Sequence, residues 1–571
     1  MQQINDFFHT LHTYIGGNNW FIFLLLGTGL FFTLYLRFPQ IRYFKHALRI
    51  VRGKYDKKTD KGDTSHFQAL ATALSGTVGT GNIAGVALAV HLGGPAALFW
   101  MLTTAFLGMC TKFVEVTLSH KYRDFDKKGM VAGGPMYYMK KRLNIKRKNG
   151  KLIKTGYWIG GFFAVATILS SFGSGSLPQI NSISNSIFAT FGIKHIVTGA
   201  IMTVLLALII IGGIKRIAKV TAKLVPVMAI IYFLGAVSVI LFNYQNILPS
   251  LAAIFNDVFT GTAAVGGFLG AGFSFAFNNG VNRGLFSNEA GQGSAPIAHA
   301  AAKAHEAVSE GMVAILEPFI DTIVICMLTG LVLLSSGVWK DKLPNQFQKT
   351  DMEVLASKFS ESEAGDVLRL ENHLSGKERL NLFSGSLAVV EGKITDDVSV
   401  IHARSLAENI TVMINNQPFT GELNIANGRL QGTDNSLAIT GNSLIHSAPL
   451  TTVAFTKSFF GDFGKYIVSI GLLLFAFSTA VAWSYYGDRA VTYLFGANYV
   501  IIYRIVFVAA FFFASFTDTT IIWNLSLLTV AFMAIPNLFG ILTLHREVKY
   551  TVKEYWQGFR EEYPDEKRPE G

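Results

Sequence analysis

The chain has 571 residues, of which 50% are hydrophobic and only 15% are charged, and its mean hydropathy is +0.38. A soluble protein of this size carries roughly a quarter charged residues, so the composition excludes an ordinary soluble enzyme and leaves room for about ten membrane spans. In a membrane protein the net charge of +12 is expected in cytoplasmic loops, and no nucleic-acid partner is predicted. Cys110 and Cys326 fall in apolar stretches and are expected to be ordinary buried thiols.

About eleven apolar stretches are long enough to cross a bilayer. They are 20–36, 67–90, 96–118, 157–180, 196–213, 218–242, 263–280, 312–335, 466–485, 500–516 and 521–544. Lysine and arginine gather between them, with about nine in 37–61 and about twelve in 121–154, whereas 243–260 has none. Because basic loops stay in the cytoplasm, this pattern places the N-terminus outside and the C-terminus inside. We therefore expect a multi-pass protein of the bacterial inner membrane, embedded in its lipid bilayer.

The segment 341–457 differs from the rest because it is polar and has no apolar stretch long enough to span. Its short runs alternate apolar and polar residues, and Asn415-Asn416, Asn427-Gly428 and 432–435 have the composition of hairpin turns. We expect a small β-rich insert on the outer face. The chain would then divide into 1–340, the first part of a transmembrane core; 341–457, the insert; 458–545, the remaining core helices; and 546–571, a cytoplasmic tail. Two interpretations of the insert remain open: a domain with no function of its own, and a module that binds a partner.

The second apolar stretch contains a glycine-rich sequence, Leu74-Ser75-Gly76-Thr77-Val78-Gly79-Thr80-Gly81-Asn82-Ile83-Ala84-Gly85. Glycine is a poor helix former, and an opened backbone in the bilayer centre is tolerated only where it lines a cavity. Such a break exposes N–H groups that suit a carboxylate and C=O groups that suit Na⁺. Small-residue packing between helices is the structural alternative. A dinucleotide-binding loop is rejected, because no soluble βαβ unit surrounds the glycines.

A second glycine-interrupted sequence, 266–280, lies in the seventh stretch and ends in paired asparagines. Counted from 67–90 as the first core helix, the two interrupted stretches are core helices one and six. They occupy corresponding positions in two five-helix halves, which indicates an inverted-repeat transporter with its site at the membrane midplane.

Several motifs closely resemble those of the alanine or glycine:cation symporter (AGCS) family. They are Gly93-Gly94-Pro95-Ala96-Ala97-Leu98-Phe99-Trp100-Met101 followed by Gly108, Gly133-Gly134-Pro135-Met136-Tyr137-Tyr138, Asn288-Glu289-Ala290-Gly291-Gln292-Gly293-Ser294-Ala295-Pro296, and Ala482-Trp483-Ser484-Tyr485-Tyr486-Gly487. Leu102 is a mild departure, because the family usually has a second tryptophan there. The resemblance covers nearly the whole chain except 341–457, which typical members lack. It implies an all-α membrane protein with a LeuT-type five-plus-five repeat, an extra N-terminal helix, and Na⁺-coupled (in some members H⁺-coupled) uptake of alanine or glycine.

On this resemblance the substrate lies among core helices one, three, six and eight. The residues expected to bind it are Thr80, Gly81, Asn82, Gln179, Phe277, Asn278 and Trp483. The first two would present backbone amides to the carboxylate, and Asn82 would add its side-chain amide. Phe277 and Asn278 are expected to close the helix-six break, and Trp483 to cap a pocket of alanine size. Gln179 lies in a polar patch, where a buried glutamine bonds either a neighbour or a ligand.

The sequence Phe475-Ala476-Phe477-Ser478-Thr479 resembles the second sodium site of the LeuT fold, where adjacent hydroxyl residues face the helix-one break. The resemblance gives Na⁺ the carbonyl oxygens of Ser75, Val78 and Phe475 and the hydroxyls of Ser478 and Thr479. Oxygen ligands suit a hard cation. The structural alternative is that the two hydroxyls bond only their own helix. No cofactor is expected besides Na⁺ as the coupling ion.

Ionisable residues also occur inside the spans. Lys112 and Glu115 are spaced as a helical pair, as are Glu317 and Asp321, and either a coupling role or structural pairing fits them. His299 and His305 are expected to be solvated near the cytoplasmic loop. A proton-coupled transporter, a channel and a substrate-sensing receptor on the same scaffold are the alternatives. A membrane-embedded enzyme is disfavoured, because no hydrolase or metalloprotease motif is found.

Overall fold

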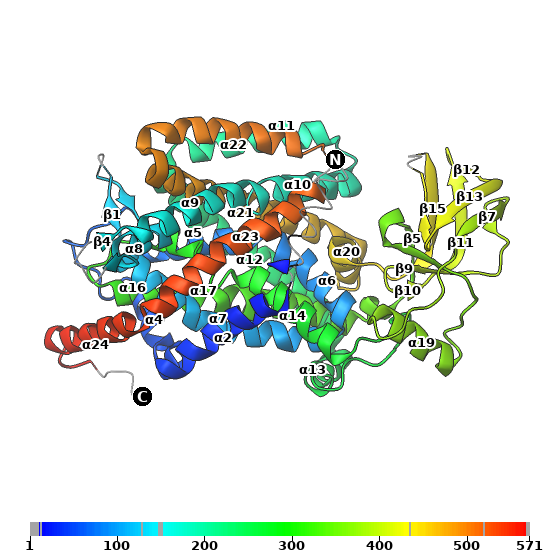
Figure 1. The fold of residues 1–571 in the computed structure, drawn as a ribbon, viewed down its shortest axis with the longest axis horizontal. Helices are drawn as coiled ribbons and strands as arrows, with labels where there is room; N and C mark the ends of the chain where they lie inside the picture. The colour runs from blue at the N-terminus through cyan, green and yellow to red at the C-terminus, as the bar shows by residue number, and fades with distance from the viewer. Residues whose placement is uncertain are drawn as a thin grey trace.

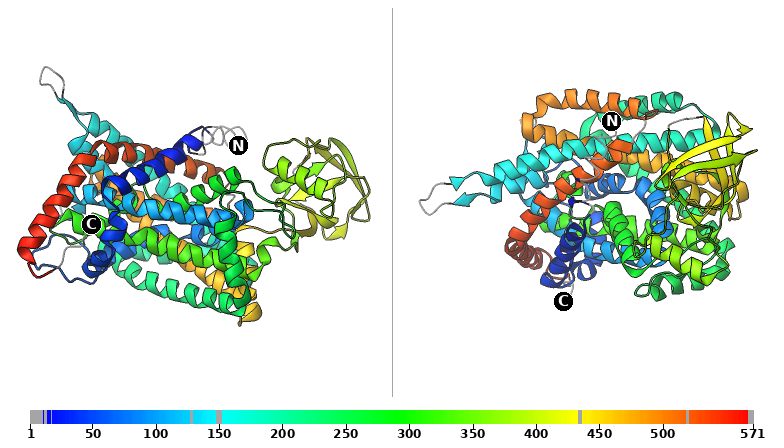
Figure 2. Two further views of the ribbon diagram at one scale, coloured as in Figure 1. Left: turned by 90° about the horizontal axis from the view of Figure 1, so that it is seen from below. Right: turned by 45° about the vertical axis from the view of Figure 1, so that its right-hand side comes forward.

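The computed structural model describes residues 11, 14–16, 18–126, 129–146, 152–432, 436–517 and 520–566. Long helices form one body, and a strand-rich lobe projects from one end of it (Figure 1). Figure 2 shows the lobe at one end of this body and the C-terminal helix α24 (His545–Glu562) at the other.

The body is built from helices that follow most of the predicted apolar stretches. Their bounds are α2 Asn19–Tyr35, α3 Pro39–Arg42, α4 Phe44–Val51, α5 His66–Thr77, α6 Ala84–Gly93, α7 Ala96–Lys121, α8 Pro135–Arg142, α9 Thr155–Gly173, α10 Leu177–Phe191, α11 His195–Ile210, α12 Gly213–Phe242, α13 Ile247–Asn256, α14 Phe273–Asn288, α15 Ala295–His299, α16 Ala307–Ala314, α17 Leu316–Pro318, α18 Met327–Ser336, α20 Ser447–Thr456, α21 Gly464–Phe495, α22 Val500–Ala514 and α23 Thr520–Thr543. Within the described residues, six helical segments are long and apolar enough to cross a membrane, or eight if each of two bent pairs is one span. A helical, multi-pass architecture is therefore confirmed, while the count of eleven spans and the LeuT-type repeat stay predictions.

The predicted break in core helix one is confirmed. The helix α5 ends at Thr77, Val78 and Gly79 are extended, a 3₁₀ turn covers Thr80–Asn82, and α6 continues at an angle of 65°. Other helices satisfy the backbone that this break opens. Thr329 Oγ1 donates to Asn82 O at 2.9 Å, and Thr451 Oγ1 donates to Ile83 O at 3.2 Å. Such compensation is what lets an irregular backbone persist in the interior of a membrane protein.

The predicted break in core helix six is misplaced. Its expected span, 263–280, begins as a turn closed by the pairs Thr262↔Ala271 and Val265↔Phe268, and α14 then runs without interruption to Asn288. The interruption follows α14, where Glu289, Gly291 and Gly293 have positive φ angles of 53°, 87° and 80°, and α15 begins at Ala295. Left-handed backbone cannot continue an α-helix, so the helix breaks in the Asn288–Pro296 motif and not among the earlier glycines.

The lobe confirms a β-rich fold within the expected insert. It contains two four-stranded sheets, ordered β12-β11-β15-β5 and β14-β13-β7-β8, and a three-stranded sheet β10-β9-β6. Its elements are β5 Leu343–Gln346, β6 Met352–Leu355, α19 Ala364–Leu374, β7 Gly385–Val390, β8 Lys393–Ile394, β9 Ser399–His402, β10 Ser405–Leu406, β11 Glu408–Ile414, β12 Gln417–Pro418, β13 Gly421–Ala426, β14 Arg429–Leu430 and β15 Leu437–Ser443. Two short hairpins, β1 Asp124–Phe125 with β2 Val131–Ala132 and β3 Ile145–Lys146 with β4 Leu152–Ile153, lie at the opposite end of the body (Figure 1).

Two of the predicted hairpin turns are confirmed. Asn415-Asn416 joins β11 to β12 and Asn427-Gly428 joins β13 to β14, and all four residues have positive φ. Two-residue turns of this kind favour asparagine and glycine because their backbone twist matches that of the strands. The third, 432–435, lies mostly outside the described residues.

The insert also ends earlier than 457. Residues 447–456 form α20, which packs in the helical body with Leu450, Ala454 and Phe455 fully buried. The helix has only ten residues and begins with a serine, so the length criterion for spans did not find it.

Candidate functional site

The five oxygens predicted to bind a cation come together beside the helix-one break. Thr479 Oγ1 lies 3.4 Å from Val78 O and 3.0 Å from Phe475 O. Ser478 Oγ lies 3.4 Å from Ser75 O and 2.9 Å from Phe475 O. All five residues are buried, so α21 faces the opened backbone with an all-oxygen surface. Both hydroxyls also bond their own helix, which is the structural alternative, and the two arrangements coexist here.

Gln179 faces the same break from the start of α10. Its Nε2 donates to Ser174 O at 3.0 Å, while its buried Oε1 has no hydrogen-bond partner among the described residues. A Cβ at Gly79 would lie 2.7 Å from Thr479 Oγ1 and 3.6 Å from Gln179 Oε1. A larger residue at position 79 would therefore clash with the Thr479 hydroxyl, and Gln179 Oε1 lies close to the same point of the backbone. A buried carbonyl without a donor suits the ammonium group of a bound amino acid.

Trp483 lies one helical turn beyond Thr479 on α21 and is fully buried. Its ring stands edge-on to Tyr486 at a centroid distance of 5.3 Å. Neither its Nε1 nor the hydroxyl of Tyr486 has a partner in the part of the chain that the structure describes. Two large aromatic groups with unsatisfied polar ends thus lie on the helix that carries Ser478 and Thr479.

Phe277 and Asn278 do not close a break, contrary to expectation. They lie in the continuous part of α14, about 15 Å before its end at 1.5 Å per residue. The ring of Phe277 packs on Trp100 at 4.8 Å and on Phe273 at 6.0 Å, so it contributes to helix packing. Phe286 of α14 does reach the helix-one break, where its ring would lie 3.6 Å from a Cβ at Gly81. Its place just before the Asn288–Pro296 motif was the sequence signal that could have identified it.

Asn82 is engaged within the protein. Its Oδ1 accepts from Gly79 N at 2.9 Å, and its Nδ2 donates to the carboxylate of Asp321. Asp321 lies in a π-helical segment, Phe319–Cys326, and also accepts from Ser287 Oγ at 2.9 Å and Thr322 Oγ1 at 2.7 Å. π-helical turns are frequent at functional sites. This buried carboxylate joins helix one, the end of α14 and the eighth apolar stretch beside the break, a link that sequence spacing did not show.

The remaining ionisable residues pair differently from the expected helical pairs. Lys112 Nζ bonds Glu317 Oε1 at 3.0 Å, and both side chains are fully buried. Glu115 instead accepts a hydrogen bond from an asparagine of α23 at 2.7 Å. His299 was expected to be solvated but is fully buried, 2.6 Å from Glu310 and 3.6 Å from Glu317. These contacts join α7 to α17 and α23, and they join α15 to α16 and α17.

Comparison with known proteins identifies the family of this chain. The model of the "Sodium:alanine symporter family" matches residues 1–367 and 435–568, so the unmatched part lies inside the insert. The chain is 35% identical over 547 residues to the sodium/alanine symporter AgcS of Methanococcus maripaludis, covering 96% of each chain. It is 34% identical over 546 residues to an uncharacterized transporter of Haemophilus influenzae, covering 95% of each. It is also 40% identical over 318 residues to the probable sodium/glutamine symporter GlnT of Bacillus subtilis, covering 56% of this chain and 63% of that relative. The chain belongs to the sodium:alanine symporter family.

Proposed function

We propose that the protein is a Na⁺-coupled symporter that imports a small neutral amino acid, alanine or glycine, by alternating access. The observation that carries this proposal is the group of five oxygens between α21 and the helix-one break. It stands next to Gln179, whose buried oxygen lacks a donor. Cation and substrate would therefore share one interrupted backbone segment, which is the requirement for coupling their binding.

Sodium supplies the link between the two halves of the transporter. With Na⁺ between them, Ser75 O and Val78 O on the helix-one side and the hydroxyls of Ser478 and Thr479 on α21 are held together. The ion thus fixes the break in one geometry. A substrate that binds to that geometry binds more tightly when Na⁺ is present, and linkage makes the effect reciprocal.

The substrate would lie between the break and Gln179. The opened backbone at Thr80 and Gly81 offers N–H groups to the carboxylate, as interrupted helices do in transporters of this type. Gln179 Oε1 would accept from the ammonium group. Trp483 closes the pocket on the α21 side and limits the length of the side chain. Asn82 would act through the backbone that it braces, because its amide is already bonded to Asp321.

The arrangement of the ends supports the proposed orientation in the inner membrane, with the N-terminus outside and the C-terminus cytoplasmic. The basic segments around α4, β1 and β4 lie at the end of the body that carries α24, and the lobe lies at the opposite end (Figure 1). Arg49 and Lys54 pair with Glu566, which links the first basic loop to the C-terminal segment. Short loops rich in lysine and arginine on one side of the membrane are the pattern that sets topology.

Uptake into proteoliposomes tests the proposal. Labelled alanine should accumulate above its equilibrium level when Na⁺ is high outside, and should only equilibrate when both sides hold the same Na⁺ concentration. Downhill flux that no ion gradient drives would indicate a channel. Binding without any flux would indicate a receptor. Either result would overturn the proposed symport.

Proton coupling is the second candidate, because Asp321 is a buried carboxylate bonded to the helix-one break through Asn82. If protons drive transport, a pH gradient should replace the Na⁺ gradient, and Asp321→Asn should abolish that drive while exchange of internal for external alanine persists. If only Na⁺ drives uptake, this candidate is rejected.

A further inference from the structure

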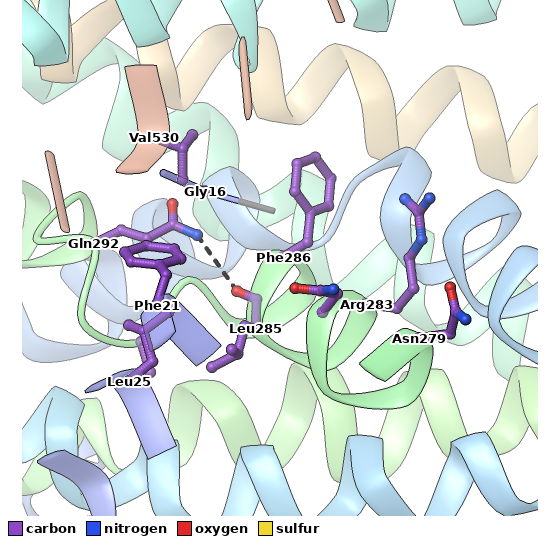
Figure 3. A pocket seen from close by; sticks show the side chains of 11 residues that line it. Gly16, Phe21, Leu25, Asn279, Arg283, Leu285, Phe286, Gln292 and Val530 are labelled. Atoms are coloured by element: carbon purple, nitrogen blue, oxygen red, sulfur yellow. Dashed lines mark hydrogen bonds between the residues drawn. The ribbon is translucent and has the colours of Figure 1, made fainter. Parts of the chain in front are cut away.

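A cavity of about 180 Å³ lies beside Phe286, whose side chain forms part of its lining (Figure 3). Four of its lining residues are spaced as one face of α14, at positions 279, 282, 283 and 286. The remaining walls come from Gly16, from α2, from α23 and from the interrupted segment after α14. The residues that line it are Gly16, Phe21, Leu25, Asn279, Asn282, Arg283, Leu285, Phe286, Ala290, Gln292 and Val530.

Arg283 is the unusual member of this set. Its side chain is partly buried in the cavity and points to the same side of α14 as Phe286 (Figure 3). Within the described residues it forms no ion pair and no hydrogen bond, and no carboxylate lines the cavity. An arginine inside a membrane protein is costly and is normally paired, so an unpaired one facing a cavity indicates a missing anion. Its planar fork matches a carboxylate with two parallel bonds.

Carboxamides provide the complementary half of the site. Asn279 Nδ2 donates to Phe275 O at 2.9 Å and Gln292 Nε2 donates to Leu285 O at 3.3 Å, so each side chain turns its amide nitrogen away to a backbone carbonyl. Within the described chain nothing donates to the oxygen of either amide, and both oxygens can accept from an ammonium group. Phe21, Leu25 and Val530 give the cavity an apolar wall for a small side chain. A guanidinium, carboxamide oxygens and a short apolar wall together fit a zwitterionic amino acid.

The position of the cavity suggests its role. Arg283 precedes the end of α14 by five residues, or about 7.5 Å, and Phe286, which also lines the cavity, lies beside Gly81 at the helix-one break. α14 begins just after a turn whose Leu269 is buried among residues of the lobe. Arg283 lies between this beginning of α14 and its end at the break, so the cavity is on the lobe side of the break. In the proposed orientation this is the outer side.

We propose that Arg283, with Asn279, Asn282 and Gln292, forms an entrance site that binds the zwitterion of a small amino acid before it passes Phe286 to the central site. The inference rests on the proposed function, since it assigns the same substrate to a second place. Arg283 binds the carboxylate, and the carboxamide oxygens bind the ammonium group. The central site at Gln179 and the cation site need not be occupied for this first binding step.

Equilibrium binding of labelled L-alanine to the full-length protein in nanodiscs at saturating Na⁺ tests the proposal. The wild type should bind two alanines per chain, and Arg283→Gln should bind one with its affinity changed less than twofold. Arg283→Lys should still bind the second alanine, but with at least fivefold lower affinity, because an ammonium group cannot form the two parallel bonds of a guanidinium. Arg216→Gln, which removes an exposed positive charge outside the cavity, is the matched control and should bind two. Glycine should displace the Arg283-dependent alanine, and alaninamide, which lacks the carboxylate, should not.

Other results would overturn the entrance site. They are a single alanine per wild-type chain, two alanines retained in Arg283→Gln, and loss of all binding in a monodisperse Arg283→Gln protein. A chloride or sulfate ion bound at Arg283 with no second alanine would also overturn it. If Arg283→Gln does not fold, Asn282→Leu on the same helix face should weaken only the second alanine, and unchanged binding there counts against the proposal. No Na⁺-dependent alanine binding in the wild type would instead refute the proposed symport itself.

Discussion

Replacing Thr479 by valine keeps the shape of the side chain and removes one of the five oxygens around the proposed cation. The hydroxyl lies 3.4 Å from Val78 O and 3.0 Å from Phe475 O, so valine leaves four oxygens and severs the direct link between α21 and Val78. The Na⁺ concentration for half-maximal uptake should rise between roughly 5- and 150-fold, which corresponds to typical coupling free energies of about 1–3 kcal/mol. The fold should lose no more than about 1 kcal/mol, because a hydroxyl has one hydrogen and its removal costs at most one neutral hydrogen bond, to Phe475 O or to Val78 O.

The assay is the initial rate of labelled alanine uptake in proteoliposomes, with Na⁺ replaced by choline at constant ionic strength. Alanine KM at saturating Na⁺ should change much less than the Na⁺ dependence. Ser484→Ala is the matched control on the same helix, since its hydroxyl bonds Val481 O at 2.7 Å and lies outside the oxygen group. An unchanged Na⁺ dependence in correctly inserted Thr479→Val would refute the assignment and make Asp321 the leading candidate for coupling.

Three further predictions concern the substrate pocket and the lobe. Trp483→Ala should let bulkier neutral amino acids compete with alanine, at a loss of about 1–3 kcal/mol in alanine binding, and unchanged competition profiles would exclude Trp483 from the pocket. Gln179→Ala should weaken alanine binding even at saturating Na⁺, as isothermal titration would show, and an effect confined to the Na⁺ dependence would contradict a substrate contact. Replacing 344–442 by Asn-Gly, which rejoins the paired residues Leu343 and Ser443, should preserve Na⁺-dependent uptake. The deletion should also lower the unfolding temperature, because Leu269 loses its burial in the lobe. Abolished uptake in membrane-inserted protein would show that the lobe is essential for transport.

The sequence predicted the helix-one break because four glycines, which are poor helix formers, lie close together inside an apolar stretch. The same reasoning misplaced the helix-six break. Gly266 and Gly270 do adopt positive φ, but in a turn before the helix, while Gly291 and Gly293 form the interruption. Glycine composition alone does not distinguish a turn at the end of a helix from a break in its middle, because both exploit the same backbone freedom.

The site could be predicted only in part, because it depends on contacts between residues that lie far apart in the sequence. The five oxygens proposed to bind the cation were predicted because a resemblance placed Ser478 and Thr479 against the helix-one break, not because local spacing did so. No such guide existed for Asp321, which spacing paired with Glu317 but which bonds Asn82 from a distant part of the chain. Phe277 was expected at the break, and Phe286 was missed, because the position of the helix end was predicted wrongly. The contact of Leu269 with the lobe likewise joins segments that sequence patterns treat as separate.

The central claim is that Na⁺ and alanine stabilise one geometry of the helix-one break, and reciprocal binding to the purified protein tests it most directly. The alanine Kd would be measured in Na⁺ and in choline, and the Na⁺ Kd with and without saturating alanine. The account predicts that each ligand tightens the other by the same factor, within the 5- to 150-fold range typical of such coupling, and that Thr479→Val reduces both factors together. Alanine binding of equal strength in Na⁺ and choline would contradict it.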